Sequence, residues 1–204
     1  MTDSFLDKAY RARSHAETRQ LYDDWAASYE AEIGQNGYAT PGRCAAALAR
    51  HIKDRSAPVL DVGCGTGLSG LALKLAGFDT IDGIDISGEM LAHARSKNIY
   101  RSLTQVDEAA PMPGKPGDYA AIAAIGVIGA GAAPISTLDT MMRHLTAGGL
   151  CVLSFNDHAL EDHRHEGRLN EWIDCGAARL LFREYGDHLL GINIKSNVYV
   201  LEKT

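Results

Sequence analysis

Short apolar runs alternate with amphipathic stretches along most of this chain. The runs predict strands at residues 59–63, 80–85, 100–107, 118–126, 150–156, 179–186 and 193–203. The stretches between them predict helices at residues 66–76, 88–97, 134–145 and 159–174. This alternation favours an α/β fold, with a mostly parallel sheet and helices on both faces. Only a short segment with glycine and aspartate separates the last two strands, which is typical of an antiparallel hairpin.

The first fifty or so residues have a helical pattern instead. Leu21, Trp25, Tyr29 and Ile33 are four residues apart and form one stripe on a helix at residues 15–33. A glycine-rich break at residues 34–37 follows, and a second helix is expected at residues 42–52. Such a stripe is typical of simple core packing. We expect one domain, residues 1–204, with a helical part at 1–52 and an α/β core at 53–204.

Composition and charge agree with an ordinary globular protein. The 204 residues are 46% apolar and 23% charged, and their formal net charge is −6. This balance argues against broad contact with nucleic acid or an anionic membrane. The first residues are charged throughout, unlike a signal peptide. Residues 119–138 carry no charge, but glycines and a proline interrupt them, so a buried strand and a turn are expected there.

The cysteines indicate neither a disulfide framework nor a zinc motif. No two of them form a CxxC pair, and the chain is long for a disulfide-stabilised fold. We therefore expect buried thiols in a reducing, cytoplasmic compartment at Cys44, Cys64, Cys151 and Cys175.

A second group of candidate ligands lies near the end of the chain. His158, Asp162 and His165 would share one face of a helix, at a spacing that can hold a metal ion. The surrounding stretch is dense in charge, so a solvated helix without metal is the favoured interpretation.

The segment VLDVGCGTGLSG, residues 59–70, carries the clearest chemical signal. Its glycines let the backbone approach a ligand closely, and a dinucleotide or S-adenosylmethionine would suit such a turn. Residues 65–70 match GxGxxG, and Asp85 follows at the distance of a ribose-binding acid. In that dinucleotide fingerprint, however, the first glycine ends the first strand, and the strand here already ends at Gly63. The dinucleotide interpretation is therefore disfavoured.

Asp61 stands two residues before Gly63, and the centre of the motif is GxGxG. With this DxGCGTG motif and the IDGIDIS segment, the chain resembles the class I S-adenosylmethionine-dependent methyltransferases. More narrowly, it is similar to the Williams–Beuren-region methyltransferase-like family. The resemblance implies a Rossmann-like, seven-stranded methyltransferase sheet, mostly parallel, with a C-terminal antiparallel hairpin. It also implies S-adenosylmethionine as the cofactor.

The resemblance implies a role for each residue of the site. Asp85 would bind the ribose hydroxyls, Asp107 the adenine amino group, and Asp61 the ammonium group, directly or through water. Each has an alternative: Asp85 as a helix cap, Asp107 as a turn residue, Asp61 as a hydrogen-bonding hub. The first helix would be a lid. The expected cofactor-binding residues are Tyr29, Tyr38, Asp61, Gly63, Cys64, Gly65, Gly67, Asp85, Ile86, Met90, Val106, Asp107 and Ile125.

Residues 125–134, which follow the fourth expected strand, contain no side chain that can act as an acid or base. This leaves the catalytic residue unassigned, with Tyr29, Tyr38 and His158 as the remaining candidates, and favours a compact or apolar acceptor. We therefore expect methyl transfer from S-adenosylmethionine to a small-molecule acceptor. The alternatives are a non-catalytic S-adenosylmethionine-binding module and, less favoured, an NAD-binding oxidoreductase. The sequence leaves the oligomeric state open.

Overall fold

A computed structural model describes residues 5, 8, 14–107, 111–129 and 131–204. Its centre is a seven-stranded sheet in the order β3-β2-β1-β4-β5-β7-β6. Neighbouring strands from β3 to β5 pair in parallel, whereas β7 is antiparallel to both β5 and β6. This confirms the expected fold. The strands are β1 (Val59–Val62), β2 (Ile81–Asp85), β3 (Ser102–Gln105), β4 (Ala121–Ala124), β5 (Leu150–Asn156), β6 (Ala178–Leu189) and β7 (Ile194–Lys203).

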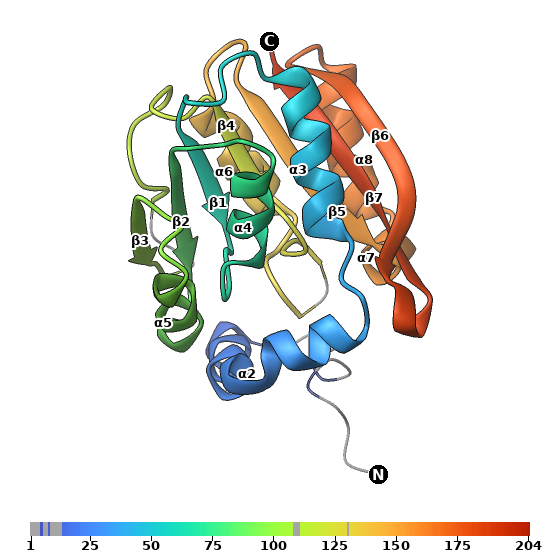
Figure 1. Ribbon diagram of the computed structural model, residues 1–204. Coiled ribbons are helices and arrows are strands. Elements are labelled where there is room, and N and C mark those ends of the chain that lie inside the picture. Colours follow the sequence, from blue (N-terminus) through green and yellow to red (C-terminus); the bar gives the residue numbers. More distant parts are fainter. Residues whose placement is uncertain (1–4, 6–7, 9–13, 108–110, 130) are drawn as a thin grey trace.

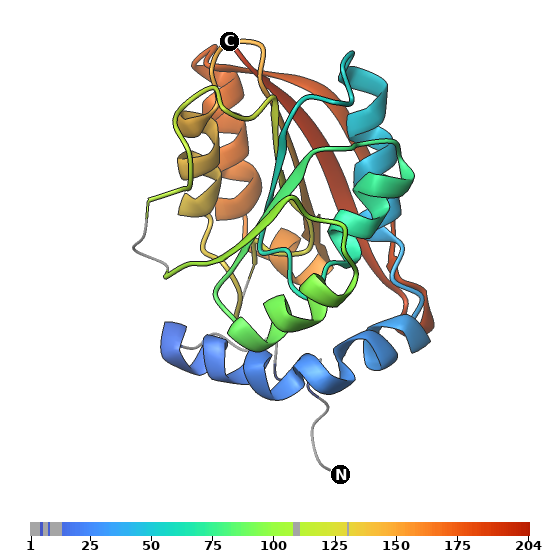
Figure 2. The same ribbon diagram turned by 60° about the vertical axis from the view of Figure 1, so that its left-hand side comes forward.

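Helices cover both faces of the sheet, as Figures 1 and 2 show from two sides. One face carries α3 (Thr40–His51) and α4 (Leu68–Leu75), and the other carries α6 (Ser136–His144) and α8 (Arg164–Asp174). Helices α2 (His15–Gln35) and α5 (Gly88–Ser96) pack against each other at the end of the sheet to which the parallel strands point. The carboxyl ends of the strands therefore face α2.

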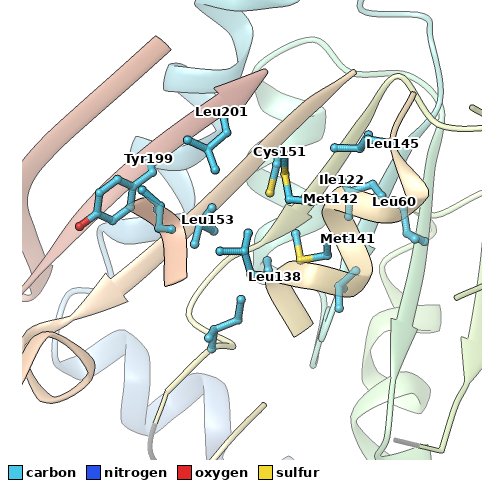
Figure 3. Packing of buried hydrophobic residues seen from close by; sticks show 14 of the residues in the cluster. Leu60, Ile122, Leu138, Met141, Met142, Leu145, Cys151, Leu153, Tyr199 and Leu201 are labelled. Atoms are coloured by element: carbon cyan, nitrogen blue, oxygen red, sulfur yellow. The ribbon is translucent and has the colours of Figure 1, made fainter. Parts of the chain in front are cut away.

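Alternation along the strands divides the core into two parts. Leu60 and Ile122 point to the face of α6 and α8, while Val59 and Ala121, their chain neighbours, point to α3 and α4. Figure 3 shows the first of these cores, where Leu138 and the methionines of α6 meet side chains from the strands. Since both faces are covered, the central strands are buried along their whole length.

One expected helix differs from the structure. The helix expected at residues 159–174 is broken into α7 (Asp157–Glu161) and α8, because the carboxylate of Asp162 accepts a hydrogen bond from the amide of Arg164 (3.0 Å). The side chain of Asn156 caps α7 by accepting from Ala159 N (3.0 Å), so this helix begins earlier than expected. A 3-10 turn, η1 (Leu190–Ile192), joins β6 to β7.

The apolar stripe of α2 is buried where this helix meets α5. Leu21, Trp25 and Ile33 are at most 7% exposed and pack with Met90 of α5 and Leu189 of β6. The second N-terminal helix behaves differently, because α3 packs on the sheet as part of its core. The two helices of residues 1–52 therefore differ: α3 belongs to the core, and α2 lies over the carboxyl ends of the parallel strands.

The uncharged residues 119–138 contain β4 and the start of α6, in keeping with the expected buried strand. Among the helices that the structure describes, none combines the length and apolar character that crossing a bilayer requires.

Candidate functional site

The glycine loop begins directly after β1. The amides of Gly63 and Cys64 both donate to the carbonyl oxygen of Ile84, at 2.8 and 3.0 Å, which ties the loop to the end of β2. Gly63 and Gly65 have φ angles of 66° and 52°, in the left-handed region that favours glycine. A Cβ on Gly65 would have no neighbour within 4 Å, whereas one on Gly63 would collide with Val127. The loop is therefore open above Gly65 and tightly packed below Gly63.

Asp85, at the end of β2, holds this loop in place. One carboxylate oxygen accepts from Gly65 N (2.8 Å), and the other accepts from Ser87 N (2.9 Å) at the start of α5. Burial raises the pKa of Asp85, while the hydrogen bonds from the backbone act in the opposite direction. Each carboxylate oxygen has a further lone pair for another donor. Asp85 can therefore organise the loop and still accept hydrogen bonds from a ligand.

Asp61 lies beneath the loop in a buried network. Its Oδ2 accepts from the hydroxyls of Ser69 (2.6 Å) and Tyr100 (2.8 Å). Its Oδ1 is buried and has no hydrogen-bond partner among the described residues. Burial raises the pKa of this carboxyl to about 7, although the two hydroxyl groups lower it. The structure thus supports Asp61 as a hydrogen-bonding hub with one acceptor atom left for a further donor.

Gly70 has a packing role that explains the apparent GxGxxG match. The amide of Gly70 donates to the Tyr100 hydroxyl (3.1 Å), and a Cβ at Gly70 would come within 2.3 Å of the same oxygen. Gly70 is therefore required by Tyr100. The strand β1 ends at Val62, one residue before the predicted end at Gly63.

A cavity of about 350 Å³ lies between this loop and α2. Its volume falls in the range of small-molecule sites. Of the expected cofactor-binding residues, Asp61 and Gly67 lie outside its lining. The structure brings the others together along its wall: Tyr29, Tyr38, Gly63, Cys64, Gly65, Asp85, Ile86, Met90, Val106, Asp107 and Ile125.

Sequence analysis missed a second face of α2. Thr18 and Tyr22 line the cavity together with Tyr29, while Trp25 between them is buried against α5. The rings of Tyr22 and Tyr29 both pack against the Trp25 ring, at centroid distances of 6.0 and 4.8 Å. This face can be recognised in the sequence from the spacing of Thr18, Tyr22 and Tyr29 at i, i+4 and i+11, beside the apolar stripe.

The β4–α6 region supplies the remaining wall. Ser136, Thr137 and Thr140 of α6 line the cavity with Val127 and the backbone of Gly126. These hydroxyls come shortly after residues 125–134, the segment that contains no acid or base. The helical period that places them on one side was available from the sequence.

Asp107 occupies the rim of the cavity. Its carboxylate forms an ion pair with Arg19 of α2, so it joins the loop after β3 to the N-terminal helix. Asp107 is thus one of the links between the core and α2.

His158 lies outside the cavity lining, so the structure does not support it as a pocket residue. Asp162 forms an ion pair with Arg164 (2.6 Å), and His165 is buried with its ring 5.4 Å from that of Phe155. The expectation of a fully solvated helix is therefore wrong for His165. In the part of the chain that the structure describes, no three His, Cys, Asp or Glu side chains are placed to hold a metal ion.

Groups that could accept a proton are limited at this site. Burial raises the pKa of the Cys64 thiol, so this side chain remains protonated at neutral pH. His188 lies behind Tyr38, with the two rings edge to face at 5.2 Å, and burial lowers its pKa to about 4. Its Nδ1 is 2.8 Å from the hydroxyl of Thr40. His188, which sequence analysis overlooked, is thus a neutral packing partner of Tyr38.

The strand order, with an antiparallel β7 between β5 and β6, and the cavity above the glycine loop define a Rossmann-like methyltransferase fold. Residues 37–189, three quarters of the chain, match the family model described as a methyltransferase domain. The chain belongs to this family. The expected class is therefore confirmed, and with it S-adenosylmethionine as the cofactor.

Two curated proteins that are named as methyltransferases are similar to this chain in sequence. The chain is 30% identical over 143 residues to methyltransferase-like protein 27 of Homo sapiens, covering 68% of this chain and 58% of that protein. It is 43% identical over 53 residues to a dTDP-3-amino-3,6-dideoxy-alpha-D-glucopyranose N,N-dimethyltransferase of Streptomyces fradiae, covering 26% of this chain and 20% of that protein. The chain thus spans less than two thirds of the length of either relative.

Solved structures share the fold across nearly the whole chain. A TehB-like SAM-dependent methyltransferase of Corynebacterium glutamicum has a TM-score of 0.59 at 20% identity, covering 94% of this chain and all of that one. The cyclase SpnF has a TM-score of 0.68 at 15% identity, covering 95% and 98%. At such identities these likenesses establish the fold and leave the reaction open.

Proposed function

We propose that this protein transfers a methyl group from S-adenosylmethionine to a small-molecule acceptor. The observation that carries the proposal is the cavity itself. The glycine loop, Asp85 and the tyrosines of α2 and the following segment all meet there, at the carboxyl ends of β1, β2 and β4. Ligands of open α/β sheets bind at this edge, where the strand order reverses.

The residues fit the cofactor in three respects. The open space above Gly65 leaves room for a ligand against the backbone, and Asp85 has lone pairs for two ribose hydroxyls. Ile86 and Met90 offer apolar surface for adenine, with Val106 and Asp107 beside it. The unpartnered Oδ1 of Asp61 suits a donor such as the ammonium group, reached directly or through a water molecule. When bound, the sulfonium supplies the activated methyl group.

The protein's own contribution would then be positioning. Transfer from a sulfonium is an in-line displacement, and the main requirement is to hold the acceptor atom against the methyl carbon with water excluded. Tyr29 and Tyr38 would cover the methionine end, with Ile125 closing the opposite side. Helix α2 would act as the lid over this site.

A small-molecule acceptor is supported by the size of the cavity and by its lining. Among the described lining residues none is lysine, arginine or histidine, so nothing there would attract the phosphates of a nucleic acid. One relative named above acts on an amino sugar nucleotide. Cys44, Cys64 and Cys151 are buried as expected, whereas Cys175 is exposed, so the expectation of a buried thiol is wrong there. A reducing, cytoplasmic setting remains part of the proposal.

The test is transfer of a labelled methyl group from S-adenosylmethionine to three separate pools: small metabolites, total RNA and denatured protein. We expect label in the small-molecule pool alone. Label in RNA or protein would contradict the small-molecule acceptor. Tight binding of cofactor without transfer to any pool would favour the non-catalytic module, the alternative that the lack of a base in the wall after β4 supports.

A further inference from the structure

The cavity contains aromatic rings and carboxylates but no cationic side chain among its described lining residues. Tyr22 and Tyr29 of α2 and Tyr38 before α3 contribute three rings to this lining. Two carboxylates, those of Asp85 and Asp107, are in the same lining. An acceptor must therefore find its partners among ring faces, hydroxyls and acidic groups.

The charges around the cavity oppose an anion there. The Asp107 carboxylate is paired with Arg19, but Asp85 has no cation as partner among the described residues, and the nearby carboxylate of Asp23 raises its pKa further. A carboxylate or thiolate acceptor would find no cationic side chain among the described lining residues, and the positive charges near it would be those of the bound cofactor alone.

The lack of a proton acceptor in the wall after β4 affects which neutral groups can be methylated. An alcohol must lose its proton during attack, whereas an amine in its free-base form already has a lone pair to donate. Residues 125–129 and 131–134 of the wall offer no proton acceptor. The thiol of Cys64 stays protonated at neutral pH, since burial raises its pKa, and so it supplies none. The two carboxylates of the lining, Asp85 and Asp107, are assigned to the ribose and adenine of the cofactor in the proposed function, so the remaining lining is adequate for an amine but poor for a hydroxyl group.

We propose that the acceptor is an amine, which would make the protein a small-molecule N-methyltransferase. This inference rests on the proposed function and specifies its acceptor. The amine lone pair forms the N–C bond while the S–C bond breaks, and the electron pair of that bond remains on sulfur. The positive charge moves from sulfur to nitrogen, and the new ammonium group then releases a proton to water. The tyrosine rings stabilise this cation by cation–π contact.

The experiment compares ligands of equal shape and different charge. The protein is first titrated with S-adenosylhomocysteine in a calorimeter, and the loaded protein is then titrated with choline, its neutral isostere 3,3-dimethylbutan-1-ol, and 3,3-dimethylbutanoate. We expect choline to bind about 5- to 30-fold more tightly than the neutral isostere, and the carboxylate to bind least.

Variants test whether the preference for choline depends on the tyrosine rings. Tyr22→Leu should reduce the preference for choline several-fold, Tyr22→Phe should keep it, and Tyr185→Leu on the exposed part of β6 should leave it unchanged. Equal affinity for choline and its isostere, including no measurable binding of either, would overturn the amine proposal. Failure of the first titration would instead contradict the proposed function.

Discussion

At the residue scale, Asp85 links the glycine loop to the start of α5 through both carboxylate oxygens. The same oxygens face the cavity, where the proposed ribose would add two hydroxyl donors. Hydrogen bonds that involve a charged partner contribute more than neutral ones, so the effect of this one side chain on ligand binding should be large.

We predict that Asp85→Ala weakens binding of S-adenosylhomocysteine by about 2–4 kcal/mol, because two charge-assisted hydrogen bonds are lost. Calorimetric titration measures the effect, and a thermal melt confirms that the variant is folded. Asp79→Ala is the matched control, since Asp79 pairs with Lys74 at the surface. Unchanged affinity in Asp85→Ala would show that this residue only caps the helix.

Asp61 should make stability depend on pH. Its pKa is raised from 3.8 to about 7 in the fold, so between these values the folded state binds more protons than the unfolded state. The free energy of unfolding contributed by Asp61 therefore falls as the pH rises from about 4 to about 7. Each pH unit in this interval corresponds to about 1.4 kcal/mol of unfolding free energy, so the loss of stability is at most about 4 kcal/mol.

The comparison is with Asp61→Asn, which keeps an acceptor for Ser69 and Tyr100 but does not titrate. Urea denaturation of the ligand-free proteins from pH 4.5 to 8 should show the wild type losing stability relative to this variant. If the two stabilities run parallel over that interval, Asp61 keeps an ordinary pKa and this account of it is wrong.

The proton acceptors form the third prediction at this scale. Tyr29 and Tyr38 line the cavity, and His158 does not. Because an amine needs no base during attack, we expect none of Tyr29→Phe, Tyr38→Phe and His158→Ala to abolish transfer. Each should reduce the rate by at most about 10²–10⁴-fold. Steady-state rates of methyl transfer to an identified acceptor measure the effect. Complete loss of transfer in one variant that still binds the cofactor normally would reveal an essential base.

At the scale of elements, α2 is joined to the rest of the fold by polar side chains as well as by its apolar stripe. Ser87 donates to Asp23 (2.5 Å), and Lys97 pairs with Glu30 (2.5 Å) while also donating to the carbonyl of Thr66 (2.8 Å). Lys97 thus bridges the helix and the glycine loop. Ligand at the loop should therefore stabilise α2.

We predict that S-adenosylhomocysteine slows hydrogen exchange across residues 15–40, because the ligand adds contacts to a helix that can otherwise open locally. Mass spectrometry with and without ligand measures this. Helix α8, none of whose residues lines the cavity, serves as the internal control. Equal exchange of residues 15–40 in both states would make α2 a static part of the core.

At the scale of the whole molecule, the sheet was predictable because its signals are local. Strand periodicity, the strand end at Gly63 and the hairpin of the last two strands each depend on neighbouring residues. These strand signals also predict that the glycine loop and Asp85 lie together on one wall of the cavity, because parallel strands present their carboxyl ends at one edge.

The other wall of the cavity depends on contacts between distant parts of the chain. Nothing near Arg19 indicates that it will pair with Asp107, and the packing of α3 on the sheet is decided by residues more than a hundred positions away. Tyr22 faces the cavity only because Trp25 is buried against α5. Tertiary packing, and not helical propensity, selects which face of α2 lines the site.

The central claim is that this fold binds S-adenosylmethionine at the glycine loop. Thermal and urea unfolding of the purified protein with S-adenosylmethionine, S-adenosylhomocysteine or NAD tests it most directly. At a hundredfold excess over the dissociation constant, either S-adenosyl compound should stabilise the fold by about 2.7 kcal/mol, and NAD should have no effect. Clear stabilisation by NAD, with none by either S-adenosyl compound, would contradict the account.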